Sequence, residues 1–115
     1  MNATMKNKVQ LIGHLGSDPE LKEVGSGRQR ALISVATKDR YKTGEEWKED
    51  TQWHRVVAWG KQAELIGQMV KKGNKIAVEG RLVHSNYVDK DGQKKYVTEV
   101  VMSDFQLMSG KPEAN

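Results

Sequence analysis

Residues 51–61, with the sequence TQWHRVVAWGK, contain the pattern that most restricts how this chain can fold. Read as a β-strand, they divide into two faces, because the side chains of a strand alternate with a period of two. One face then holds Trp53, Arg55, Val57 and Trp59, and the other holds His54, Val56 and Ala58. A buried guanidinium needs a partner, and none is adjacent in the sequence. We therefore expect the two indoles and the guanidinium to share an exposed face.

An exposed face of this kind suits an unpaired nucleic-acid strand. Every base has a π-face that an indole can stack against, and every nucleotide has a phosphate that a cation can neutralise. The alternative is an edge strand with two half-buried tryptophans. Both interpretations stay open until the other elements are placed.

Four more strands are predicted from apolar or alternating runs that end at turn residues. They cover residues 9–15, 29–37, 75–87 and a returning segment that ends at Leu107, with residues 21–24 as a short continuation of the first strand. In the fourth strand Ile76, Val78 and Leu82 point inward, and Gly80 marks a bend. Residues 38–50 are polar and predict a long, exposed and mobile loop.

A helix is predicted between the third and fourth strands. From Lys61 the apolar period becomes helical, with Ala63, Ile66 and Val70 on one face and Gly73 at the C-terminal end. Three strands, a helix and two strands is the element order of an OB-fold, an all-β, five-stranded Greek-key barrel. Such barrels bind oligonucleotides and oligosaccharides on the face of their second and third strands.

A projecting β-hairpin is predicted between the fourth and fifth strands. Asp91-Gly92 is a strong signal for a two-residue hairpin loop. Counting outward from that loop places Tyr87 opposite Tyr96, with lysines at positions 94 and 95 along one arm.

The composition limits the class of protein without deciding it. At 115 residues the chain has room for one domain, and its net charge of +4 permits a polyanionic partner. The absence of cysteine excludes disulfides and thiolate metal sites. No apolar run approaches the length of a membrane span, and no signal-peptide pattern occurs, so we expect a soluble, cytoplasmic protein.

The other candidate sites are weaker. His14, His54 and His84 lack metal-ligand spacing, and we expect neither a metal nor a cofactor. Residues 25–28 lack the lysine and the hydroxyl residue after it that end a phosphate-binding loop, and they favour a plain turn. The acidic residues of the segment 45–50 indicate a solvated loop that would repel DNA locally. No catalytic constellation can be assembled, so the sequence predicts a protein that is not an enzyme.

Three groups of residues resemble the bacterial single-stranded DNA-binding protein family. They are Asn7-Lys8-Val9 with residues 13–20, then residues 53–57 leading to Gly60-Lys61, and finally Gly92-Gln93 with Tyr96 and residues 98–100. The resemblance covers residues 7–108, as the DNA-binding domain, between an N-terminal extension (1–6) and a short tail (109–115). The long linker and acidic tip of the family are missing, so we expect this chain not to capture the family's replication and repair proteins.

The resemblance implies sequence-nonspecific binding and protection of single-stranded DNA during replication, recombination and repair, by a nucleoid-associated homotetramer. It implies that four aromatic side chains stack on bases, and these match Tyr41, Trp53, Trp59 and Tyr87. The first and last are most familiar in the family as tryptophan and the third as phenylalanine. It also implies that His54 lies near a subunit interface.

Phosphate contacts are expected from basic residues near the aromatic face. The candidates are Arg55 and Lys61, followed by Lys72, Lys94 and Lys95. The alternative function is an OB domain used for protein docking or for an oligosaccharide, with the aromatic side chains as interface anchors. Salt dependence separates the two, because only phosphate neutralisation makes affinity fall steeply with salt.

Overall fold

The computed structural model describes residues 6–108. Its elements are β1 (Val9–Leu15), β2 (Glu20–Val24), β3 (Arg28–Thr43), β4 (Glu46–Trp59), α1 (Gly60–Met69), β5 (Lys75–Val88) and β6 (Lys94–Leu107). The predicted tail 109–115 and most of the N-terminal extension lie outside the described residues. Within residues 6–108, no helix is long and apolar enough to cross a membrane.

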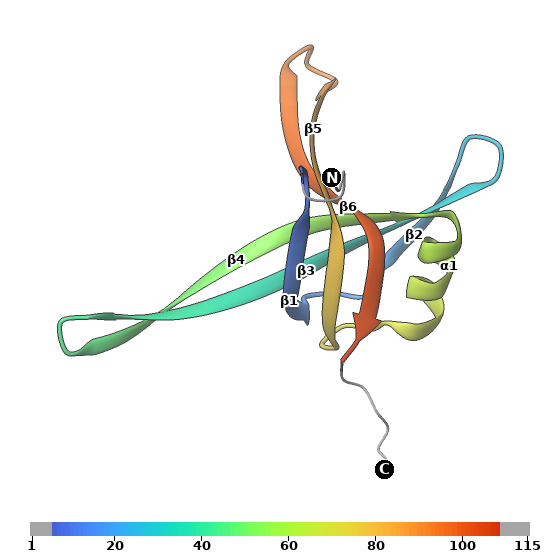
Figure 1. Cartoon of the computed structure of the whole chain (residues 1–115). Helices are drawn as coiled ribbons and strands as arrows, with labels where there is room; N and C mark the ends of the chain where they lie inside the picture. The colour runs from blue at the N-terminus through green and yellow to red at the C-terminus, as the bar shows by residue number, and fades with distance from the viewer. Residues whose placement is uncertain (1–5, 109–115) are drawn as a thin grey trace.

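Five strands close into a barrel. The hydrogen-bonded order is β1-β5-β6-β4-β3, and pairing of His14 and Leu15 in β1 with Ala36 and Val35 in β3 joins the ends. The strand β2 pairs with the N-terminal half of β3, on the same edge of β3 that pairs with the end of β1. The helix α1 lies between β4 and β5 in the chain and packs against β3, β4 and β6 (Figure 1). The predicted all-β OB-fold barrel is confirmed.

The core follows the alternation that the sequence predicts. In β3 the side chains of Ala31, Ile33 and Val35 are buried, whereas Leu32 and Ser34 between them are only partly covered. The core is completed by Val56 and Ala58 of β4, Ile76 and Val78 of β5, Val100 and Met102 of β6, Leu15 of β1, and Ala63, Ile66 and Val70 in and after the helix. Inward-facing residues of all five barrel strands therefore meet in one cluster with the inner face of α1.

Residues 38–43 and 46–50 form strand, and the prediction of a long mobile loop over 38–50 is wrong. The ladder between β3 and β4 continues without interruption to the pair Thr43 and Glu46. Between them, Gly44 has a φ of 66° and Glu45 does not have a positive φ, as expected for a two-residue type II′ turn. The polar composition does not indicate a strand, because this ribbon projects from the barrel and neither of its faces is buried. We call residues 38–43 and 46–51 the arm (Figure 1).

The hairpin between β5 and β6 projects as predicted, but its predicted register is wrong by one residue. The observed pairs are Val88 with Lys94, Tyr87 with Lys95, and Asn86 with Tyr96. The loop has three residues rather than two: the Asp89 amide donates to the Gln93 carbonyl (2.9 Å), and Gly92 takes the positive φ at the third loop position. As a result, Tyr87 and Tyr96 lie on opposite faces of the ribbon.

Three smaller expectations had different outcomes. The irregularity at Gly80 is confirmed, because the β5–β6 register shifts between Glu79 and Gly80. Leu82 was expected inside but is 37% exposed, since it lies where the ribbon leaves the barrel. The helix ends at Met69 rather than beside Gly73, whose amide instead donates to the carbonyl of Leu15 (3.0 Å).

Truncating a valine in the barrel should destabilise the fold far more than truncating one on the ribbon. Val35 is fully buried and Val88 is 64% exposed. Val35→Ala removes two buried methyl groups and leaves a cavity, which should lower the free energy of unfolding by about 2 kcal/mol. Val88→Ala is the matched control and should change it little. Urea unfolding measures both, and equal effects would contradict this core assignment.

Candidate nucleic-acid interface

The outer face of β4 has the composition that the sequence predicts. Trp53 is 61% exposed and Arg55 is exposed beside it, whereas Val56 and Ala58 point into the core. Trp59 lies on the same outer face but is only partly exposed. The predicted division of the strand into two faces is confirmed, but the outer face is not exposed along its whole length, because Val57 is only 3% exposed and Trp59 is partly covered.

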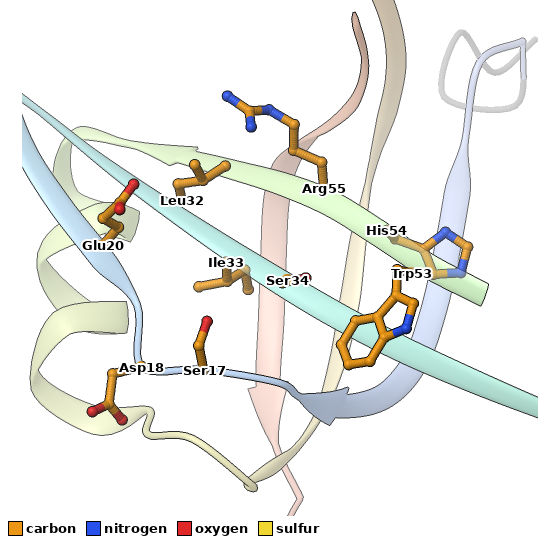
Figure 2. Close-up of a pocket in the computed structure, with 9 residues that line it drawn as sticks. All are labelled: Ser17, Asp18, Glu20, Leu32, Ile33, Ser34, Trp53, His54 and Arg55. Carbon is orange, nitrogen blue, oxygen red and sulfur yellow. The ribbon is translucent and has the colours of Figure 1, made fainter. Parts of the chain in front are cut away.

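The Trp53 side chain borders a hollow of about 300 Å³. The hollow lies between β3, β4 and the segment leading into β2, and Figure 2 shows its lining: Ser17, Asp18, Glu20, Leu32, Ile33, Ser34, Trp53, His54 and Arg55. The indole packs over Gly16, where an added Cβ would lie 2.5 Å from the ring carbon Cζ3. Glycine at this position therefore allows the ring to lie against the end of β1.

Arg55 has a partner that local sequence could not reveal. Its Nε donates to the Glu99 carboxylate at 2.7 Å. The two residues are far apart in the chain but come together because β4 and β6 are parallel neighbours, with Val56 paired to Val100. The expected exposure of the guanidinium is confirmed, and Glu99 is an additional partner. Since the Arg55 side chain remains 45% exposed, a phosphate could still approach it in competition with Glu99.

Two arginines that sequence reasoning did not select lie beside Trp59. The Arg28 guanidinium carbon lies 4.2 Å from the centroid of the Trp59 ring, and Arg30 pairs with Trp59 across the ladder. The Nε of Arg30 is buried and has no hydrogen-bond partner within residues 6–108. Arg30 alternates with the buried residues of β3, so the sequence is enough to put it on the outer side of that strand. Only the register shows that it lies beside Trp59.

The β5–β6 hairpin presents different residues on its two faces. Counting along the ladder, Tyr87, Lys95 and Glu99 share one face, and Lys94 and Tyr96 share the other. Because Glu99 contacts Arg55, the Tyr87 face continues the outer face of β4. The structure therefore brings Tyr87 and Lys95 to the same side as Trp53, while Lys94 lies on the opposite side.

The remaining predicted residues are more dispersed. Lys61 is exposed in the first turn of α1. Lys72 lies beyond the helix, and its backbone amide donates to Asp18 Oδ1 at 2.8 Å, which places it beside a carboxylate of the hollow. The exposed Tyr41 belongs to the arm, and the register puts it on the face opposite to Trp53.

Two of the three histidines, His54 and His84, have hydrogen-bond partners within the chain. His54 Nε2 lies 2.8 Å from the hydroxyl of Thr37, and His84 Nδ1 lies 2.9 Å from the hydroxyl of Thr98. Across residues 6–108, no three side chains of a metal-binding type gather closely enough to hold an ion.

Comparison with known proteins agrees with the geometry. The model of the single-strand binding protein family matches residues 6–108. The chain belongs to this family. Its members bind DNA rather than catalyse a reaction, in agreement with the sequence prediction.

Two single-stranded DNA-binding proteins of this family are close in sequence. Single-stranded DNA-binding protein 1 of Xylella fastidiosa is 44% identical over 112 residues, covering 95% of this chain and 82% of the relative. Single-stranded DNA-binding protein 1 of Chlorobaculum tepidum is 46% identical over 107 residues, covering 91% of this chain and 66% of the relative. The resemblance inferred from the sequence motifs is confirmed.

A solved structure of the family is close in fold. It is a Plasmodium falciparum SSB in complex with single-stranded DNA, with a TM-score of 0.83 and 31% identity. The match covers 95% of this chain and all of that one.

The packing of Trp53 on Gly16 leads to a testable expectation. Gly16→Ala would place a methyl group inside the indole, so the ring should move outward toward water. We expect red-shifted tryptophan emission and stronger quenching by acrylamide. The same substitution in a Trp53→Phe background is the control and should leave the emission unchanged. Identical spectra with glycine and alanine, when Trp53 is present, would show that the ring does not depend on this contact.

Proposed function

We propose that this chain binds single-stranded DNA without sequence preference, and thereby protects it during replication, recombination and repair. The observation that carries the proposal is the exposed Trp53 beside Arg55 on the outer face of a barrel whose family relatives are DNA-binding proteins. Such a protein would act in the cytoplasm, on the nucleoid.

Stacking supplies sequence tolerance. In this proposal bases stack on Trp53, Trp59 and Tyr87, which share the outer face, and on Tyr41, which a strand would reach by passing around the arm to its opposite face. A base presents a π-face whatever its identity. Duplex DNA hides these faces, so it should bind much less well. Trp59 already has Arg28 over its ring, and a base at this site must stack on the other side or displace the guanidinium.

Phosphates would be neutralised by basic groups around the aromatic side chains. The proposed set is Arg55, Lys61, Lys72 and Lys95, with Lys94 as the weakest candidate because it lies on the opposite face of its ribbon beside Tyr96. Arg28 and Arg30 near Trp59 are added to this set. The carboxylates of Asp18, Glu20 and Glu99 lie among them and reduce the local positive potential. Stacking is therefore expected to contribute a large share of the affinity, with a moderate salt dependence.

Replacing Trp53 tests this function directly. Trp53→Ala should weaken binding of a labelled homopyrimidine strand by about 1 to 3 kcal/mol, the usual contribution of one stacked base. The control is Tyr96→Ala, because Tyr96 is 75% exposed but lies on the opposite face of its ribbon. Fluorescence anisotropy at several salt concentrations measures both. Unchanged affinity in a folded Trp53→Ala protein, or affinity insensitive to salt, would contradict the proposal.

We further propose that the working form is a homotetramer. One OB barrel contacts only about 4 to 16 nucleotides, so wrapping a longer strand needs several copies. The family resemblance implies a subunit contact near His54, and this proposal is supported by the side chain lying on the β4 face away from Trp53.

The assembly can be tested at His54. Light scattering should give the mass of a tetramer, and His54→Ala should shift the equilibrium toward smaller species by removing a subunit contact. Thr37→Val is the control, since it breaks the internal hydrogen bond of His54 without removing the ring. A monomer at every concentration would exclude this assembly.

A further inference from the structure

The charges of the arm are sorted by face. Because β3 and β4 stay in register to the turn, the alternation of side chains assigns every arm residue to one of two faces. The basic face holds Lys38, Arg40, Lys42, Trp47, Glu49 and Thr51. The acidic face holds Asp39, Tyr41, Thr43, Glu46, Lys48 and Asp50. Three cations and one carboxylate thus lie on one face, against one cation and three carboxylates on the other.

Trp47 lies at the centre of the positive charge on the basic face. The Arg40 guanidinium carbon is 5.4 Å from the centroid of its ring, and the Lys42 ammonium nitrogen is 5.9 Å away. Lys42 is the direct cross-strand partner of Trp47, and Arg40 is the diagonal one. Within residues 6–108, neither cation forms an ion pair with a carboxylate, so both charges remain available to an anion.

The basic face continues the outer face of the barrel. Trp47, Trp53 and Trp59 are separated by six residues each along β4, so the alternation puts all three on one side of the strand. At about 3.3 Å per residue, successive tryptophans in this row are roughly 20 Å apart along the strand. The twist of the strand also rotates them relative to one another. The arm projects from the barrel (Figure 1), so the row of indoles and cations continues away from the barrel.

We propose that Trp47, Arg40 and Lys42 form an additional binding site for single-stranded nucleic acid on the arm. A base stacks on the indole, and the two cations contact the flanking phosphates. This site rests on the function proposed above, and it serves strands that extend beyond one barrel face. Trp47 is 60% exposed and its ring contacts are with cations, so packing within the described chain does not account for the tryptophan.

The fluorescence of Trp47 can be measured without a contribution from the other tryptophans. The chain has three tryptophans, so Trp53→Phe with Trp59→Phe leaves Trp47 alone, while phenylalanine still offers a ring for stacking. A homopolymeric thymidine strand several times longer than one barrel's site should quench the Trp47 emission. A strand of about 8 nucleotides, which one barrel can hold, should quench it much less.

Substitutions on the two faces give an independent measurement. Trp47→Ala should weaken binding of the long strand by roughly five-fold or more, as expected for loss of one stacked base. Lys42→Ala should reduce the slope of log K against log salt by about 0.7, the value for one phosphate of a single strand. Lys48→Ala makes the same charge change on the acidic face of the same arm and should reduce the slope much less, because Asp39, Glu46 and Asp50 share that face.

The outcomes separate this inference from the proposed function. Unquenched Trp47 emission in a double-phenylalanine protein that still binds the long strand would overturn the arm site alone. The same holds if Tyr41→Ala weakens binding and Trp47→Ala does not, or if Trp47→Ala breaks the assembly without changing affinity, since Trp47 would then be a protein contact. Failure of the unmodified chain to bind any single strand would overturn the proposed function itself.

Discussion

The antiparallel ladder between β3 and β4 determines most of what this molecule presents to its surroundings. It runs without a register shift from the pair Arg30 and Trp59 to the pair Thr43 and Glu46. At the barrel end, burial of Val35 and Val56 fixes which face is inside. A slip of one residue would turn every side chain to the other face, so burial of the core also sets the orientation of Trp53 and of the distant arm.

Aromatic surface and charge have unequal roles on the outer face. Arg55 is paired with Glu99, and Asp18 and Glu20 border the hollow beside Trp53, so the cations there act against nearby carboxylates. An exposed ion pair contributes little stability, about 0 to 1 kcal/mol, and can be exchanged for a phosphate at small cost. A stacked base contributes about 1 to 3 kcal/mol whatever its identity. The geometry therefore favours affinity that depends mainly on stacking and tolerates any sequence.

Much of the barrel was predictable because its strands have an apolar side. Alternation identified the buried residues Ala31, Ile33 and Val35 of β3 and Val56 and Ala58 of β4 without any knowledge of neighbouring strands, but it put the buried Val57 on the outer face. The arm was missed because both of its faces are polar, and the hairpin register was missed because Gly92 is the third loop residue rather than the second. The contact of Arg55 with Glu99 depends on the parallel pairing of β4 with β6, and the pairing of Arg30 with Trp59 depends on the register of the β3–β4 hairpin; local patterns contain neither.

The central claim is that single-stranded DNA follows the outer face of β4. Photochemical cross-linking with a strand containing 5-iodouracil, followed by mass spectrometry of the joined peptides, tests it most directly. The account predicts cross-links at Trp53 and at Tyr87, which shares its side of the barrel. Tyr96 is the most exposed of the aromatic side chains but faces the other way. Cross-links concentrated at Tyr96, with none at Trp53, would contradict the account.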